Sequence, residues 1–189
     1  PAPGGGSAAA LEGALGAALT AMVCALTVGK KKYADVQELA IESQKKGNEL
    51  KAQFVDVIDR DTEAFNAVSA VFAMPKDTDE EKAARQAAMQ EALTGCTKTP
   101  FEMMQLACQA LELTRSVVGK LNASAASDLG CAALSLKAAI QGAWLNVLIN
   151  IGGIQDQAFA DEYRQKGQAL LDKALPLADA IYQEVLESL

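Results

Sequence analysis

The chain has 189 residues, of which 50% are hydrophobic and only 5% aromatic, and its formal net charge is -7. Such an Ala- and Leu-rich composition favours helices over strands, and the acidic balance argues against nucleic acid as the main partner. The chain contains no histidine, which excludes Ser-His-Asp and Cys-His triads, the HExxH zinc motif and any histidine proton shuttle.

The four cysteines are far apart and form no CxxC pair; they are Cys24, Cys96, Cys108 and Cys131. We interpret them as small, buried, reduced residues of a cytoplasmic protein, and we expect no metal site. Any chemistry must therefore come from carboxylates, amides, lysines, hydroxyls or backbone groups.

The chain opens with PAPGGGSAAALEGALGAALTAMVCALTVGKKKY. We expect a helix with Ser7 as its N-cap that extends to about Gly29. Small residues at four-residue spacing let another helix approach closely; they are Ala9, Gly13, Ala17 and Ala21. The length of this run and the lysines at 30–32 would also suit a membrane span. We favour a buried central helix, because Ala and Gly insert weakly and the other helices are amphipathic.

The next segment predicts a helix from about Val36 to Ala73, either continuous or broken near Gly47 and ended by Pro75. After it, Thr78 and the glutamate three residues later form a capping-box pattern that starts another helix.

TKTPFEM repeats the start signal, with Thr99 as N-cap, Pro100 at the first helical position and Glu102 three residues after the cap. A polar loop then leads into a helix through Asn150, and Asp156 is a candidate N-cap of a last helix that reaches Glu187. The sequence thus predicts an all-α fold, a compact bundle of about six helices that forms a single domain over residues 1–189.

One apolar stripe of the second predicted helix is interrupted by a carboxylate. The stripe consists of Leu50, Phe54, Val57, Ala64, Val68 and Phe72. Asp61 fills the seven-residue gap in this stripe, so it is carried toward the core, where a carboxylate must be paired or hydrogen-bonded. Asp61 is therefore a candidate general base or acid. A structural aspartate, satisfied by a neighbouring helix end or a lysine, is equally consistent with the spacing.

A second polar anomaly lies in the helix that ends near Asn150. Its stripe consists of Asp128, Ser135, Ala139, Gly142, Asn146 and Asn150. Two asparagines in the apolar run GAWLNVLIN need hydrogen-bond partners. They either join two helices or form an amide pair that reads a polar heterocycle, with Gly142 leaving room for it.

The glycine-rich start places free backbone N–H groups where the helix dipole favours negative charge. The residues concerned are Gly4, Gly5, Gly6 and Ser7. No GK[ST] segment follows, so this is not a Walker A motif, and a flexible turn before a helix is the simpler interpretation.

Taken together, these segments resemble the cyclodeaminase/cyclohydrolase family of folate enzymes. The matching stretches are PAPGGGSAAALEGALGAALTAMV, GKKKY, DRDTEAFNAV, MPKDTDEEKAARQ, SDLGCAA and GAWLNVLIN, in the family's order. The resemblance implies an all-helical homodimer without metal or redox cofactor that acts on a tetrahydrofolate derivative. Asp61 falls where the family's DxDAxAF-like segment carries its proposed proton acceptor, although Thr62 stands here in place of the usual Ala.

In this family, 5-formiminotetrahydrofolate closes to 5,10-methenyltetrahydrofolate with loss of ammonia, or the methenyl bridge is hydrolysed to 10-formyltetrahydrofolate. A chain without a fused formiminotransferase leans to the cyclohydrolase, with a separate formiminotransferase as a candidate partner. The implied substrate-binding residues are the GGGS segment, Lys30, Lys31, Lys32, Asp128, Gly142, Asn146 and Asn150. The lysines would meet the glutamate tail of the folate, although a solvated helix end is their commoner explanation. The alternative function, a non-catalytic helical scaffold, gives Asp61 no role.

Overall fold

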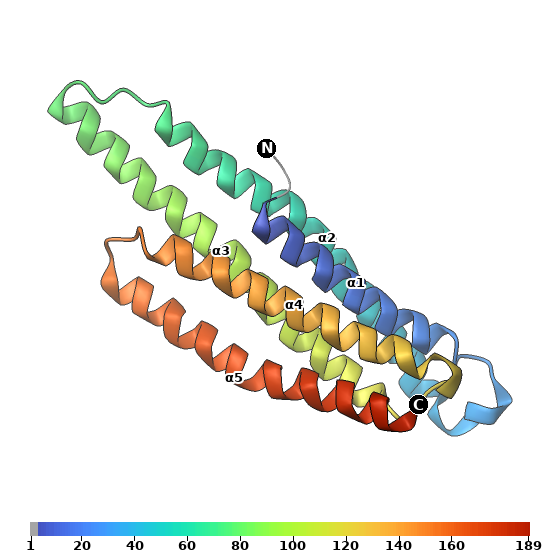
Figure 1. Ribbon diagram of the computed structural model, residues 1–189. Coiled ribbons are helices and arrows are strands. Elements are labelled where there is room, and N and C mark those ends of the chain that lie inside the picture. The colour runs from blue at the N-terminus through green and yellow to red at the C-terminus, as the bar shows by residue number, and fades with distance from the viewer. Residues whose placement is uncertain (1–3) are drawn as a thin grey trace.

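The computed structural model describes residues 4–189, and these form an elongated helical bundle (Figure 1). The elements in chain order are α1 (Gly5–Ala25), the 3-10 helix η1 (Lys31–Val36), α2 (Gln37–Phe72), α3 (Asp79–Val117), the 3-10 helix η2 (Ala123–Ala125), α4 (Ala126–Ile151) and α5 (Gln157–Ser188). The predicted all-α bundle is confirmed, with five α-helices in the described chain where we expected about six.

The missing sixth helix is explained by Pro100. The predicted start at Thr99 is wrong, because α3 continues through Pro100 without a break. A proline inside a helix leaves the carbonyl four residues earlier without its usual N–H donor, which here is the carbonyl of Cys96. That oxygen accepts instead from Asn150 Nδ2 of α4 at 2.6 Å. A hydrogen bond between helices therefore compensates for the bond that the proline removes.

The other helix ends agree with the sequence except at α1. The Thr78 capping box is present, since Thr78 Oγ1 accepts from the Glu81 N–H at 3.2 Å and Glu81 Oε2 accepts from the Thr78 N–H at 3.0 Å. Asp156 caps α5 through the Phe159 N–H. At α1, however, the N-cap is Gly4, and the predicted cap Ser7 lies in the first turn with its side chain turned to another helix.

α1 is the central helix that the small-residue stripe predicted. It runs antiparallel to α2 and α4 and packs between them (Figure 1). A Cβ on Gly13 would lie 2.3 Å from the Phe54 ring of α2, and one on Gly16 would lie 2.5 Å from Leu136 of α4. α2 is continuous past Gly47, which packs against Ala21 of α1. The glycines thus bring α1 within contact distance of both neighbours.

Within residues 4–189, two helices are long and apolar enough to cross a membrane by length and composition, α1 and the segment Ala123–Ile151. In α1, 56% of the apolar window is buried inside the bundle. A core helix of a soluble protein passes the same test, and the packing of α1 between α2 and α4 favours that interpretation.

Candidate functional site

Four helices bring polar side chains together where α1 begins. We call this cluster the N-terminal site; it consists of Gly5, Gly6 and Ser7 of α1, Asp61 of α2, Cys96 of α3, and Asn146 and Asn150 of α4. The cluster forms because α1 is antiparallel to both α2 and α4, so its first turn lies beside the middle of α2 and near the end of α4 (Figure 1).

The Asp61 carboxylate lies directly against the first turn of α1. Its Oδ2 accepts a hydrogen bond of 2.9 Å from Oγ of Ser7, a side chain that is only 4% exposed. A Cβ on Gly6 would lie 2.3 Å from Asp61 Oδ1 and 2.6 Å from Oδ2, so any larger residue here would displace the carboxylate. The free N–H groups and dipole of the α1 start favour the negative charge there. The predicted aspartate thus meets a helix end.

Asp61 has a neutral hydrogen-bond partner but no cationic one. None of the salt bridges within residues 4–189 involves it. Its neighbour Arg60 pairs instead with Glu102 of α3 through two hydrogen bonds of 2.8 Å. The half-buried carboxylate is therefore fixed by Ser7 on one oxygen, and its charge is not neutralised by an ion pair.

Cys96 is a neighbour of Asp61 that the sequence interpretation missed. Burial raises the pKa of the Cys96 thiol, and the negative charge of Asp61 raises this pKa further. The thiol therefore stays neutral near pH 7 and is a poor nucleophile. The sequence signal that could have found it is Pro100, which frees the Cys96 carbonyl for a bond from another helix.

The two asparagines of α4 have different surroundings. Asn150 joins two helices through the bond from its Nδ2 to the Cys96 carbonyl, as one of the two interpretations expected. Asn146 Nδ2 donates to the Gly142 carbonyl of its own helix at 2.9 Å, and its amide lies against Gly5. Both side chains are partly exposed, so each amide oxygen remains available as an acceptor.

Gly142 does not leave room for a ligand in this structure. A Cβ on Gly142 would lie 3.1 Å from the Cβ of Ala9 in α1. The space beside this glycine is thus taken by α1, and the structure gives Gly142 a role in helix packing.

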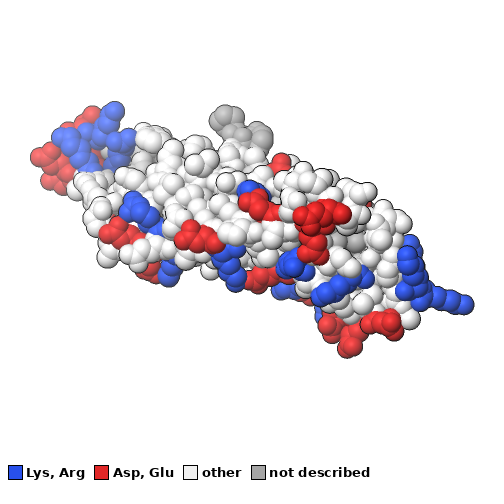
Figure 2. Space-filling model, turned by 60° about the horizontal axis from the view of Figure 1, so that its bottom comes forward, with Lys and Arg blue, Asp and Glu red and all other residues white. Residues whose placement is uncertain are grey.

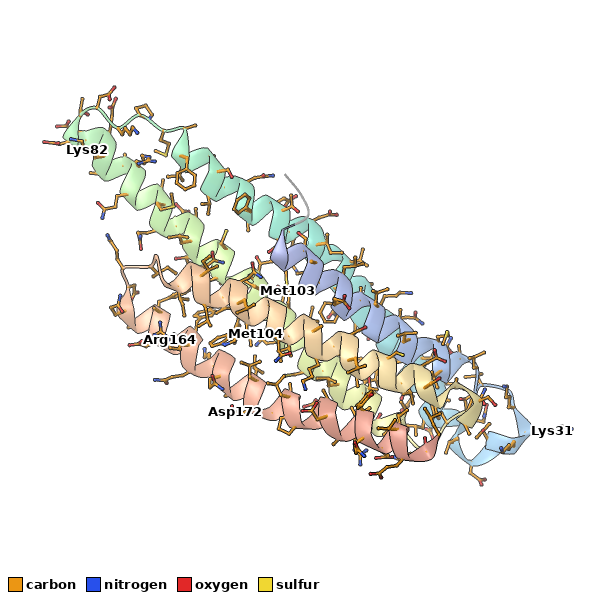
Figure 3. All side chains as sticks on the ribbon, viewed as in Figure 1. Lys31, Lys82, Met103, Met104, Arg164 and Asp172 are labelled. Atoms are coloured by element: carbon orange, nitrogen blue, oxygen red, sulfur yellow. The ribbon has the colours of Figure 1, made fainter. Side chains whose placement is uncertain are left out.

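The remaining predicted residues lie far from Asp61. Lys30, Lys31 and Lys32 follow the other end of α1, where Figure 3 shows Lys31 at the tip of the molecule. Because a helix rises about 1.5 Å per residue, the part of α1 after Ser7 alone spans about 27 Å. Asp128 lies in the first turn of α4, a similar length of helix away from Asn146. One chain therefore does not bring the lysines or Asp128 to the N-terminal site.

The apolar stripe of α2 changes its surroundings at Asp61. Leu50, Phe54 and Val57 are fully buried, as predicted for a core-facing stripe. Past Asp61 the prediction holds at Val68, which is 8% exposed, and is wrong at Phe72, which is 64% exposed. Phe72 is the last residue of α2 and lies well past Gly5, where α1 begins, so α1 does not cover it.

The fold and the N-terminal site define a class of protein: an all-α bundle that presents a carboxylate and two amides at the start of its central helix. Residues 1–169 match the family model described as formiminotransferase-cyclodeaminase. The chain belongs to this family.

Individual relatives agree with the family match. The chain is 43% identical to the methenyltetrahydrofolate cyclohydrolase of Methylorubrum extorquens, over 98% of this chain and 89% of the relative. It is 34% identical to the formimidoyltransferase-cyclodeaminase of Rattus norvegicus, over 92% of this chain but only 32% of that longer protein. The solved structure of formiminotetrahydrofolate cyclodeaminase from Thermotoga maritima matches with a TM-score of 0.80 and 27% identity, over 100% of this chain and 88% of the other.

Proposed function

We propose that this protein is an enzyme of tetrahydrofolate one-carbon transfer that hydrolyses 5,10-methenyltetrahydrofolate to 10-formyltetrahydrofolate. The cyclodeamination of 5-formiminotetrahydrofolate is the closely related second activity. The observation that carries the proposal is the Asp61 carboxylate, held by Ser7 against the start of α1. The similarity to a cyclohydrolase along nearly the whole chain supports the order of the two activities.

Asp61 can supply what the hydrolysis needs. Water adds to the methenyl carbon between N5 and N10, a new C–O bond forms, and Asp61 accepts the proton that the water loses. The C–N5 bond of the tetrahedral carbon then breaks as N5 takes up a proton and the new hydroxyl loses its own, which leaves the formyl group on N10. Before water attacks, the substrate bridge is cationic, so the Asp61 charge also stabilises it electrostatically.

The same residue serves the second reaction. When the formimino carbon on N5 is attacked by N10, a base must take the N10 proton, and the amino nitrogen must receive a proton so that it leaves as ammonia. In both reactions the acceptor oxygens of Asn146 and Asn150 are suited to the N–H groups of the pterin edge. The chemistry requires only proton transfer and charge stabilisation, so we expect no cofactor.

We further propose that the protein works as a homodimer in the cytoplasm. The outward faces of α1 and α4 carry large exposed apolar side chains: Leu11, Leu15 and Met22 on α1, and Leu134, Leu145 and Ile149 on α4. In the view of Figure 2, charged side chains gather at the two ends, along the lower edge and in a group right of the middle, and the upper part of the molecule is largely uncharged. A contiguous apolar face of this kind is typical of a subunit interface.

A two-fold axis across this face would also explain the distant lysines. If α1 packs antiparallel to the α1 of a second copy, the far end of one α1 approaches the N-terminal site of the other. The segment Lys30–Lys32 of one subunit would then meet the folate tail bound beside Asp61 of the other subunit.

The proposed function is tested by offering both folates to the purified protein. Absorbance of the methenyl chromophore should fall when methenyltetrahydrofolate is supplied, faster than in buffer alone. With 5-formiminotetrahydrofolate, a rise of the same absorbance with release of ammonia identifies the cyclodeaminase activity. Absence of both changes, in a protein with a folded helical spectrum, would contradict the proposal and favour a non-catalytic role.

A further inference from the structure

An exposed aromatic side chain lies on α2 one turn past Asp61, beside the apolar stripe. Phe65 follows Asp61 by four residues, so the two side chains lie on one face of α2, about 5–6 Å apart at their Cβ atoms. Phe65 is 56% exposed, whereas Val57, one turn before Asp61 on the same stripe, is fully buried. A large apolar ring is thus open to the surface directly beside the candidate catalytic carboxylate.

The register of α1 places this ring just beyond the start of α1. Gly13 of α1 packs on Phe54, and Gly6 packs on Asp61. Moving one more turn along α2 reaches Phe65, which lies past Gly5, the first residue of the α1 helix. The ring therefore lies next to the N-terminal site but is not part of the core that α1 closes.

The structure of the folate substrate indicates which group the Phe65 ring can contact. The carbon on which Asp61 acts is bonded to N5 of the pterin ring and to N10, which carries a benzoyl ring. A planar ring system must then lie within a few ångströms of the reacting carbon, the same distance that separates Phe65 from Asp61. Aromatic rings prefer offset-stacked or edge-to-face partners, so Phe65 is suited to a flat conjugated heterocycle.

A second exposed aromatic on α2 does not fit this role. Phe72 is three turns from Asp61, about 16 Å along the helix axis, too far to contact a ring next to the reacting carbon. The Arg85 guanidinium already lies 6.0 Å from the centre of the Phe72 ring. Phe72 is therefore a matched control for an exposed phenylalanine on the same helix.

We propose that Phe65 binds a planar ring of the folate substrate by stacking and so positions the one-carbon bridge at Asp61. This inference rests on the proposed function and adds a specificity residue to it. Because the stacking acts on bound substrate, removing the ring should weaken binding more than it slows the proton transfer.

The test compares Phe65→Ala, Phe65→Tyr and the control Phe72→Ala in the methenyl absorbance assay. Phe65→Ala should raise KM about tenfold or more, as expected when one aromatic stacking partner is lost, with a smaller change in kcat. Phe65→Tyr keeps the ring and should keep KM near the wild-type value. Phe72→Ala should behave as the wild type.

A binding readout separates stacking from a general structural effect. The chain has one tryptophan, and Phe65→Trp adds a second at the proposed subsite. Titration with 5-formyltetrahydrofolate should quench the added fluorescence beyond the change seen in the wild type, which serves as the baseline. Equal quenching in both proteins would overturn the proposal.

Two further outcomes are distinguishable. If the wild type turns over either folate and Phe65→Ala has unchanged KM and kcat, the role of Phe65 is refuted while the proposed function stands. If Phe65→Ala loses activity only in step with dissociation of a dimer in sedimentation runs, the ring belongs to a subunit interface and the proposal is also refuted. A wild type that acts on neither folate refutes the proposed function itself.

Discussion

Gly6→Ala tests the position of Asp61 without touching any side chain that takes part in chemistry. The added Cβ would lie 2.3 Å from Asp61 Oδ1, whereas ordinary contacts begin at 3.4 Å. The carboxylate must therefore move by about 1 Å, and a displacement of that size can cost about a hundredfold in rate. We expect kcat to fall by roughly this factor, in initial rates of methenyl absorbance at saturating substrate.

The stability of Gly6→Ala should change little. Alanine improves helix propensity by about 1 kcal/mol over glycine, which offsets part of the cost of displacing the Asp61 side chain. Gly95→Ala in α3 is the matched control, because a Cβ at Gly95 meets nothing within 4 Å. This control should gain stability in thermal unfolding and keep full activity. If Gly6→Ala keeps wild-type kcat, the position of Asp61 against α1 does not matter for the reaction and our reasoning is refuted.

The remaining predictions concern the lysines, the apolar face and the cysteines. Changing Lys30, Lys31 and Lys32 together to Gln should raise KM for a polyglutamylated folate more than for the monoglutamate, by a factor that shrinks at high salt; equal effects would show a solvated helix end. Leu145→Glu on the α4 face should shift the sedimentation of the protein from dimer toward monomer, and an unchanged dimer would exclude this face from the interface. Burial raises the pKa of the Cys24 and Cys108 thiols to about 11, so few of these thiols ionise at pH 8. The sequence interpretation of four buried cysteines is wrong at Cys131, which is exposed. A thiol reagent at pH 8 should therefore label Cys131 first and the three buried cysteines only after unfolding; rapid labelling of all four would contradict the packing.

Local signals in the sequence were sufficient for most helix ends and for the central anomaly. The Thr78 capping box and the Asp156 cap depend on residues within one turn, and both are present in the structure. The gap in the α2 stripe likewise placed Asp61 on the face that meets α1. Each of these predictions needed only the period of a helix or the chemistry of a cap.

The errors have one physical cause, which is contact between helices distant in sequence. Pro100 carries a local start signal, yet α3 continues because Asn150 from α4 satisfies the freed Cys96 carbonyl. Ser7 is a good cap by residue type, but its hydroxyl is used by Asp61 of α2. No local pattern contains either partner, so neither outcome could be predicted from the segment alone.

The sequence also failed to predict which residues lie together in the N-terminal site, for the same reason. The sequence grouped Asp128 and the lysines at 30–32 with Asp61, and the structure separates them by most of the length of α1 and α4. Conversely, Cys96 joined the N-terminal site through its carbonyl, which Pro100 frees and Asn150 of a distant helix binds. An apolar stripe predicts which face of its own helix a residue occupies. Which residues of other helices contact that face depends on where those helices begin and end.

The measurement that tests the central claim most directly is the kcat of Asp61→Asn. Asparagine keeps the shape of the side chain and can still accept the Ser7 hydrogen bond, but it removes the proton acceptor and the charge. We expect kcat to fall by at least about a hundredfold, since general-base catalysis contributes about 10²–10⁴ in rate, with thermal stability level or higher. The exposed Asp59→Asn, on another face of α2, should change little. Equal activity losses in the two variants, or inactivity of Asp61→Asn that comes only from unfolding, would contradict the assignment of Asp61 as the proton acceptor.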